Sequence, residues 1–157
     1  MGRLSAVIGL GSLLAFAGCG GGGADGEPLL SGALTGQYKG EAFTPTSGFA
    51  TVYKGKNLVG IGDGPLNCDS PQATAPPAGV NVAFTLPTLD VGSYSSVLVM
   101  IHYNRGDYEA SGTNSGIVTV SASTETSFAG SIAYSYTNDE GDTSGVSGTF
   151  EVIRCPE

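Results

Sequence analysis

The residue types that usually perform chemistry are scarce in this chain. It holds a single histidine, His102, three cysteines, at positions 19, 68 and 155, and no tryptophan. His102 directly follows the apolar residues 97–101, so we expect it at the end of a strand. A catalytic role would require a nucleophile and an orienting acid within hydrogen-bond reach. The sequence marks no nucleophile, so we expect a structural histidine, no catalytic residue and no enzyme.

One acidic segment could hold a cation. Residues 138–142 place one amide and three carboxylates within five positions, and hard oxygens of this kind are the ligands that Ca²⁺ prefers. Their spacing is not that of an EF-hand loop. We predict a solvated turn between two strands, with weak calcium binding as the alternative, and we assign no metal ligand.

Two other short segments look like known motifs. Residues 60–64 are similar to a phosphate-binding glycine loop, but Pro65 follows where that motif needs a helix. We expect a turn there, in which the glycines supply positive φ. Residues 105–107 form the Arg-Gly-Asp tripeptide that integrins read on a hairpin tip, and we expect an ordinary turn.

Composition excludes several classes of partner. The 157 residues carry a net charge of −8, with 40% hydrophobic and 13% charged side chains. Such a chain is long enough for one domain, and it is too weakly charged to be disordered through self-repulsion. An acidic chain has little with which to neutralise phosphates, so we expect no nucleic-acid partner. We also expect no cofactor, because metal-binding side chains are few.

The first 18 residues are typical of an export signal. Arg3 precedes an apolar stretch of about 14 residues, whereas a helix needs roughly 20 to cross a bilayer. Residues 14–19, Leu-Ala-Phe-Ala-Gly-Cys, resemble the lipobox of bacterial lipoproteins, in which the cysteine becomes the acylated N-terminus. We therefore expect a lipoprotein signal peptide over 1–18 and lipidation of Cys19, with palmitate among the acyl chains. The alternative is cleavage before Gly18 by ordinary signal peptidase, which would release a soluble secreted protein.

Cysteine parity supports lipidation. Three cysteines are an odd number for a chain bound for an oxidising compartment, and lipidation of Cys19 leaves the pair Cys68 and Cys155. A disulfide between these two would close a loop of about 87 residues and stabilise the fold by about 4 to 5 kcal/mol. We predict this disulfide, with two free thiols or pairing between chains as the alternatives.

A glycine-rich segment follows Cys19. We expect a flexible tether over 19–31 and a single all-β domain over 32–157. The residue after Cys19 is Gly20, and at this position the sequence resembles lipoproteins that are sorted to the outer membrane. The expected location is therefore the cell envelope, with the protein attached to the outer membrane by its lipid and facing the periplasm or the surface.

Alternation of apolar and polar residues with period two predicts the fold. The clearest strands are 127–137 and 146–152, which the turn at 138–142 joins as a hairpin. Residues 97–101 are apolar on both faces, which favours a central strand covered on both sides. Residues 65–79 contain several prolines and are expected to form a long loop pinned by the disulfide. Further strands are expected near residues 34–42, 48–54, 57–62, 80–86 and 118–121.

About eight short antiparallel strands fit either a β-sandwich or a small β-barrel. Strand parity alone does not separate the two architectures. The sequence therefore predicts an all-β domain with one of these two arrangements.

Four segments of the sequence, taken together, are similar to those of a known group of proteins. They are the lipobox ending at Cys19, residues 39–45 (Lys-Gly-Glu-Ala-Phe-Thr-Pro), Asn67 with Cys68, and the closing residues 146–152 with Cys155. They resemble a group of uncharacterised predicted lipoproteins of Gram-negative bacteria. The resemblance implies an exported, single-domain β protein, and it brings no activity, cofactor or catalytic residue with it.

Three functions remain open from the sequence. The first is an envelope lipoprotein whose domain is a non-enzymatic binding or structural module, with an envelope protein as its partner. The second is a β-barrel that binds a small molecule or lipid, which requires an apolar cavity in place of a filled core. The third is a hydrolase, which requires a carboxylate of strongly raised pKa or His102 paired with an acid.

Overall fold

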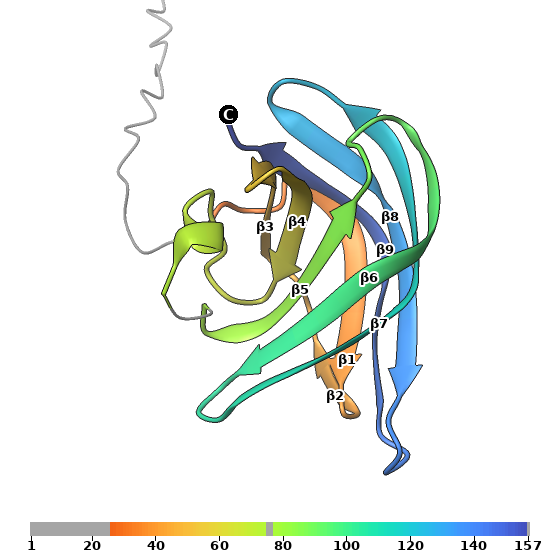
Figure 1. Ribbon diagram of the computed structural model, residues 1–157. Helices are drawn as coiled ribbons and strands as arrows, with labels where there is room; N and C mark the ends of the chain where they lie inside the picture. Colours follow the sequence, from red (N-terminus) through yellow and green to blue (C-terminus); the bar gives the residue numbers. More distant parts are fainter. Residues whose placement is uncertain (1–25, 75–76, 157) are drawn as a thin grey trace, which may run out of the picture.

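The computed structural model describes residues 26–74 and 77–156, and strands make up most of this part of the chain. Figure 1 shows the strands curling into a barrel, with a short helical turn beside it. The elements are β1 (Ser31–Tyr38), β2 (Glu41–Phe43), β3 (Ser47–Tyr53), β4 (Lys56–Gly62), the 3₁₀ helix η1 (Ser70–Gln72), β5 (Gly79–Leu86), β6 (Gly92–Asn104), β7 (Tyr108–Ser123), β8 (Ser127–Thr137) and β9 (Thr143–Arg154).

Strands β3 to β9 form a closed ring. Each strand from β3 to β9 pairs antiparallel with the next along the chain, and β9 returns to pair with β3. Strand directions alternate around the ring, so a ring of seven must contain one parallel pair. That pair is β3 with β9, where Phe49 lies opposite Ile153 and Ala50 opposite Arg154. The fold is therefore a small barrel, not a sandwich.

The other two strands form a hairpin beside this ring. β1 pairs antiparallel with β9 over residues 31–37, and β2 pairs only with β1. The turn between them places Lys39 and Gly40 at φ 48° and 81°, the two consecutive positive values that a two-residue hairpin turn requires. Phe43 of β2 folds back over Gly36 of β1, where any side chain would collide with its ring.

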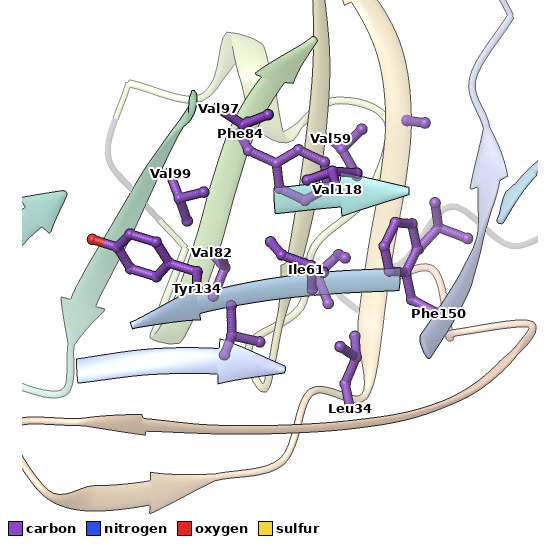
Figure 2. Packing of buried hydrophobic residues seen from close by; sticks show 14 of the residues in the cluster. Leu34, Val59, Ile61, Val82, Phe84, Val97, Val99, Val118, Tyr134 and Phe150 are labelled. Carbon is purple, nitrogen blue, oxygen red and sulfur yellow. The ribbon is translucent and has the colours of Figure 1, made fainter. Parts of the chain in front are cut away.

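The barrel interior is filled with apolar side chains. Figure 2 shows side chains of opposite strands, such as Val82 and Phe150, pointing into one shared space. Phe150 packs against Phe84 and Phe128, with ring centroids 6.1 and 6.0 Å apart. The largest fully buried side chains are Phe84, Phe128, Ile61, Ile101, Val59, Val80, Val82, Val99, Val118, Val120 and Val152. Burial of this much apolar surface supplies most of the driving force for folding.

The prediction of an all-β domain with about eight strands is confirmed, and the described residues form nine strands. Two details of the prediction were wrong. Residues 34–42 do not form one strand, because the turn at residues 39–40 divides them and buries Phe43 instead of Ala42. Residues 97–101 are not covered on both faces, since Leu98 is 44% exposed while Val97 and Val99 point inward.

Backbone hydrogen bonds join the first described residues to the rest of the domain. Glu27 N donates to Leu66 O at 2.5 Å, and Leu30 N donates to Glu151 O at 2.8 Å. The last residues of the expected tether over 19–31 are thus already hydrogen-bonded to the domain. In Figure 1 the end of β9 lies at the opposite end of the barrel from the β1–β2 and β8–β9 turns.

Candidate functional site

Residues 63–74 and 77–78, called here the covering loop, lie against the outside of the barrel. Cys68 in this loop is bonded to Cys155, which follows β9, with the two Cα atoms 5.6 Å apart. The predicted disulfide and the predicted loop are therefore confirmed. The bond joins the loop to the strand that closes the barrel.

Apolar side chains occupy part of the space between the covering loop and the barrel. Phe49 of β3 points outward, yet only 3% of its surface is exposed, because Leu66 and Cys155 pack over it. Leu58 and Ile153 border this group. These residues form a second, smaller apolar cluster, separate from the one inside the barrel.

Two polar side chains fasten the near end of the covering loop. Ser47 Oγ donates to Gly64 O and accepts from Leu66 N at 3.1 Å. Asn67 N donates to Ser70 Oγ at 2.9 Å, and Asn67 Oδ1 accepts from Asp69 N at 3.0 Å. These bonds satisfy backbone groups that the strands leave without partners.

Asn81 of β5 fastens the far end. Its Nδ2 donates to Pro77 O at 3.0 Å and to Ala78 O at 3.4 Å. Its Oδ1 is buried and accepts no hydrogen bond from the described residues. Asn81 lies beside Gly62, where any side chain would collide with Oδ1. The loop is therefore fixed at both ends as well as at the disulfide.

A pocket of about 350 Å³ remains between the covering loop and the barrel. Residues of β3 to β6 line one side of it, and Leu66, Ser70, Pro71, Ala73 and Pro77 of the covering loop line the other. Phe49, Leu58 and Leu66 give it apolar walls, and His102 stands on the β6 side. No aspartate, glutamate, lysine or arginine is among the described residues that line it.

His102 is half-buried and paired with a phenol, not with an acid. It lies within β6, two residues before the end of that strand. Its Nδ1 is 2.8 Å from the Tyr108 hydroxyl, and the two rings stack with centroids 6.1 Å apart. Burial lowers the pKa of His102, so the imidazole is neutral at pH 7.

The hydrolase hypothesis named two features, a carboxylate of raised pKa and His102 paired with an acid. The hydrogen bonds that Glu109 accepts from Lys39 and Tyr38 lower the pKa of that carboxylate. The ring nitrogen Nδ1 of His102 faces Tyr108. His102 is thus paired with a phenol and not with the acid that the hydrolase hypothesis names.

The acidic segment 138–142 forms the β8–β9 turn, as expected. Asn138 Oδ1 accepts from Glu140 N at 3.0 Å and from Asp142 N at 2.8 Å. The amide oxygen that a cation would use is therefore already engaged. Within residues 26–74 and 77–156, no group of three or more histidine, cysteine or acidic side chains is placed to hold a metal ion.

The glycines of residues 60–64 have a different role from the predicted one. Gly60 and Gly62 belong to β4, and neither they nor Gly64 has a positive φ. They are needed because neighbours approach closely. A Cβ at Gly60 would lie 2.7 Å from Phe49 Cε1, and one at Gly64 would collide with Ala78 O.

Residues 105–107 form the β6–β7 turn, as expected. Arg105 is engaged in two ion pairs, with Glu41 of β2 and with Asp63 of the covering loop. Asp63 also accepts from Val80 N at 2.6 Å. The arginine therefore connects three segments of the protein instead of standing free at a hairpin tip.

Sequence reasoning missed one polar cluster. Tyr38 donates to Glu109 at 2.8 Å, Lys39 pairs with the same carboxylate at 2.6 Å, and the Tyr38 ring stacks on Tyr103 with centroids 5.1 Å apart. Burial and the hydrogen bond to Glu109 raise the pKa of Tyr38. The cluster joins the β1–β2 hairpin to β6 and β7, and no local pattern could have revealed it because the partners are distant in sequence.

Cys19 and the whole predicted signal peptide lie outside the described residues. None of the described residues forms a helix long and apolar enough to cross a bilayer. Comparisons with family models, curated proteins and solved structures find no match for this chain. The site must therefore be interpreted from its own geometry.

Proposed function

We propose that the protein is a bacterial envelope lipoprotein, attached to the outer membrane through lipidated Cys19, whose barrel is a non-enzymatic binding or structural domain. The observation that carries the proposal is the bond between Cys68 and Cys155. Such bonds persist in oxidising compartments, which a protein reaches by export. The bond also leaves Cys19 without a cysteine partner in the chain, and Cys19 is the residue at which the lipobox ends.

The filled barrel supports a role for the outer surface. Side chains such as Phe84 and Phe128 occupy the interior, so a partner or ligand would meet the outer faces and the hairpin turns. An acidic chain attached by a short tether would present these surfaces to other envelope proteins.

Intact mass spectrometry of the protein from the membrane fraction of its host tests the proposal. The expected mass equals residues 19–157 plus acyl chains, and two alkyl groups are added only after reduction. A Cys19→Ser variant is the control and should lose the acyl mass. An unacylated chain that begins at Gly18 in the soluble fraction would contradict the proposal and support a secreted protein instead.

A second candidate function is the binding of a small molecule or lipid outside the barrel, because the interior that a ligand-binding barrel would use is filled. The pocket beneath the covering loop favours it, because the pocket is apolar and of the size that small ligands occupy. Native mass spectrometry of protein purified without denaturation would show a retained ligand as an added mass. A protein that carries no added mass and takes up none from a lipid extract would contradict this candidate.

A further inference from the structure

The geometry points to the pocket beneath the covering loop as a binding site for a neutral, largely apolar small molecule with one hydrogen-bonding group. This inference rests on the proposed binding function and assigns it a place on the domain. The site lies outside the barrel, whereas the sequence directed attention to the barrel interior.

The lining determines the charge of the ligand. Phe49, Leu58 and Leu66 line the pocket together with two prolines, Pro71 and Pro77. No charged side chain is among its described lining residues. An ion in this pocket would lose hydration without gaining an opposite charge, and that costs several kcal/mol. A neutral ligand avoids this penalty.

The volume of about 350 Å³ suits a small ligand. Small-molecule pockets span about 300 to 1,000 Å³, so this one lies at the lower end of that range. Its floor is low because small residues face outward there. Gly60 of β4 pairs with Ala83 of β5, and both line the pocket. Larger residues at these two positions would fill it.

The pocket exists before any ligand binds. The disulfide at Cys68 holds the covering loop in the middle, and the bonds made by Ser47 and Asn81 hold its ends. A binding site that is already formed loses little conformational entropy when a ligand enters. The three attachments therefore hold the covering loop in the position that forms the pocket.

His102 supplies the polar contact. The other polar side chains on the lining are Ser70 and Asn81, and Ser70 Oγ and Asn81 Nδ2 already bond to the covering loop. Asn81 Oδ1, which accepts no hydrogen bond from the described residues, lies against Gly62 and Gly64. His102 Nδ1 is paired with Tyr108, and its Nε2 makes no hydrogen bond within the described residues. A neutral imidazole has one donor and one acceptor nitrogen, so the Tyr108 hydroxyl fixes the role that Nε2 can play.

Binding of N-phenyl-1-naphthylamine by the full protein tests the inference. This fluorescent probe is neutral and aromatic and has one N–H donor. We expect saturable binding by the wild type and binding weaker by about tenfold or more for Ala83→Leu, which fills the pocket. Ala129→Leu is the matched control: Ala129 is also half-buried, on the outer face of β8, and its replacement should leave binding unchanged. All variants are measured in the same detergent, so the fluorescence of probe dissolved in micelles is the same for each of them and can be subtracted.

A second variant keeps the test decisive if Ala83→Leu fails to fold. Ala73 lines the pocket from the covering loop and is exposed, so Ala73→Leu obstructs the pocket without disturbing a strand. It should weaken binding in the same direction. Equal binding by the wild type and both pocket variants, or no saturable binding at all, would overturn the inference. Acylation measured on the same samples reports on the anchor separately, so the two proposals can fail independently.

Discussion

The outer faces of the two sides of the barrel are built differently. Over β3 to β6, outward positions carry Phe49 and Leu58, and the covering loop lies on them. Over β8 and β9, outward positions carry small residues such as Ser131, Ala133 and Thr149, which are exposed or half-buried. Both sides contribute the same kind of apolar side chain to the interior.

This difference shows that the outward residues decide which face needs a cover. An apolar patch exposed to water promotes association, so it must be buried by a loop or by a partner. Small hydroxyl-bearing residues are hydrated at little cost and need no cover. The covering loop completes a second small core, and the pocket is the space which that core leaves unfilled.

Removal of the disulfide should have the largest effect on the covered side. A Cys68→Ser/Cys155→Ser variant loses a constraint across 87 residues, and the loop-entropy model gives a loss of about 4 to 5 kcal/mol in the free energy of unfolding. Urea denaturation of wild type and variant measures it. Equal midpoints for the two proteins would mean that the loop is held by its other contacts alone.

Truncation of an outward residue should distinguish the two faces directly. Phe49→Ala removes a ring that is 3% exposed and should cost about 3 kcal/mol of stability. Ser131→Ala, on the uncovered face, should change stability by less than about 0.5 kcal/mol. Chemical denaturation of both variants gives the comparison. Similar small losses in both would show that the cluster beneath the covering loop contributes no packing energy.

Replacement of glycine by alanine should have different effects on stability at Gly60 and at Gly92. Gly60→Ala would place a Cβ 2.7 Å from Phe49 Cε1, and this crowding should cost about 1 to 3 kcal/mol. Gly92 has no positive φ, and a Cβ there would meet only Tyr94, at 3.6 Å or more, so Gly92→Ala should be neutral or slightly stabilising. The melting temperatures of the two variants test this prediction. Equal melting temperatures would show that the Phe49 ring moves aside at no cost in stability.

The smallest expected effect is a pH dependence that comes from His102. Burial lowers the pKa of the folded-state histidine, so below about pH 6.5 the unfolded state binds a proton that the folded state does not. Stability should therefore fall as the pH drops from about 6.5 towards the lowered folded pKa. His102→Gln removes this contribution, and the stability difference between the two proteins, followed by denaturation across this range, should change with pH. A constant difference would show that His102 titrates equally in both states.

The strands were predictable where alternation is strong. Residues 127–137 form β8 with the expected bounds, because Phe128, Ile132 and Tyr134 alternate with small polar residues. The strand β7 is far longer than the predicted 118–121, since residues 108–116 carry no alternation and are held by their pairing with β6. Long-range pairing of this kind leaves no local signal.

The candidate site was predictable only in part. Cysteine parity identified the bond between Cys68 and Cys155, and the prolines identified the loop that it pins. The sequence did not reveal that Phe49 lies beneath this loop, because alternation alone does not tell the inner face of a barrel from the outer. Nor could it reveal the contact of His102 with Tyr108 across the β6–β7 hairpin, which depends on the register of that pair.

The parallel contact between β3 and β9 determines when the ring of strands can close as the chain is synthesised. This contact joins Phe49 to Ile153 and Ala50 to Arg154, and Cys155 N adds a bond to Ala50 O at 2.8 Å. In a chain that emerges N-terminus first, the ring therefore cannot close until residues 153 and 154 have been made. Until then the edge of β3 near Phe49 and Ala50 stays open to other chains, and loss of residues 153–155 would remove its partner.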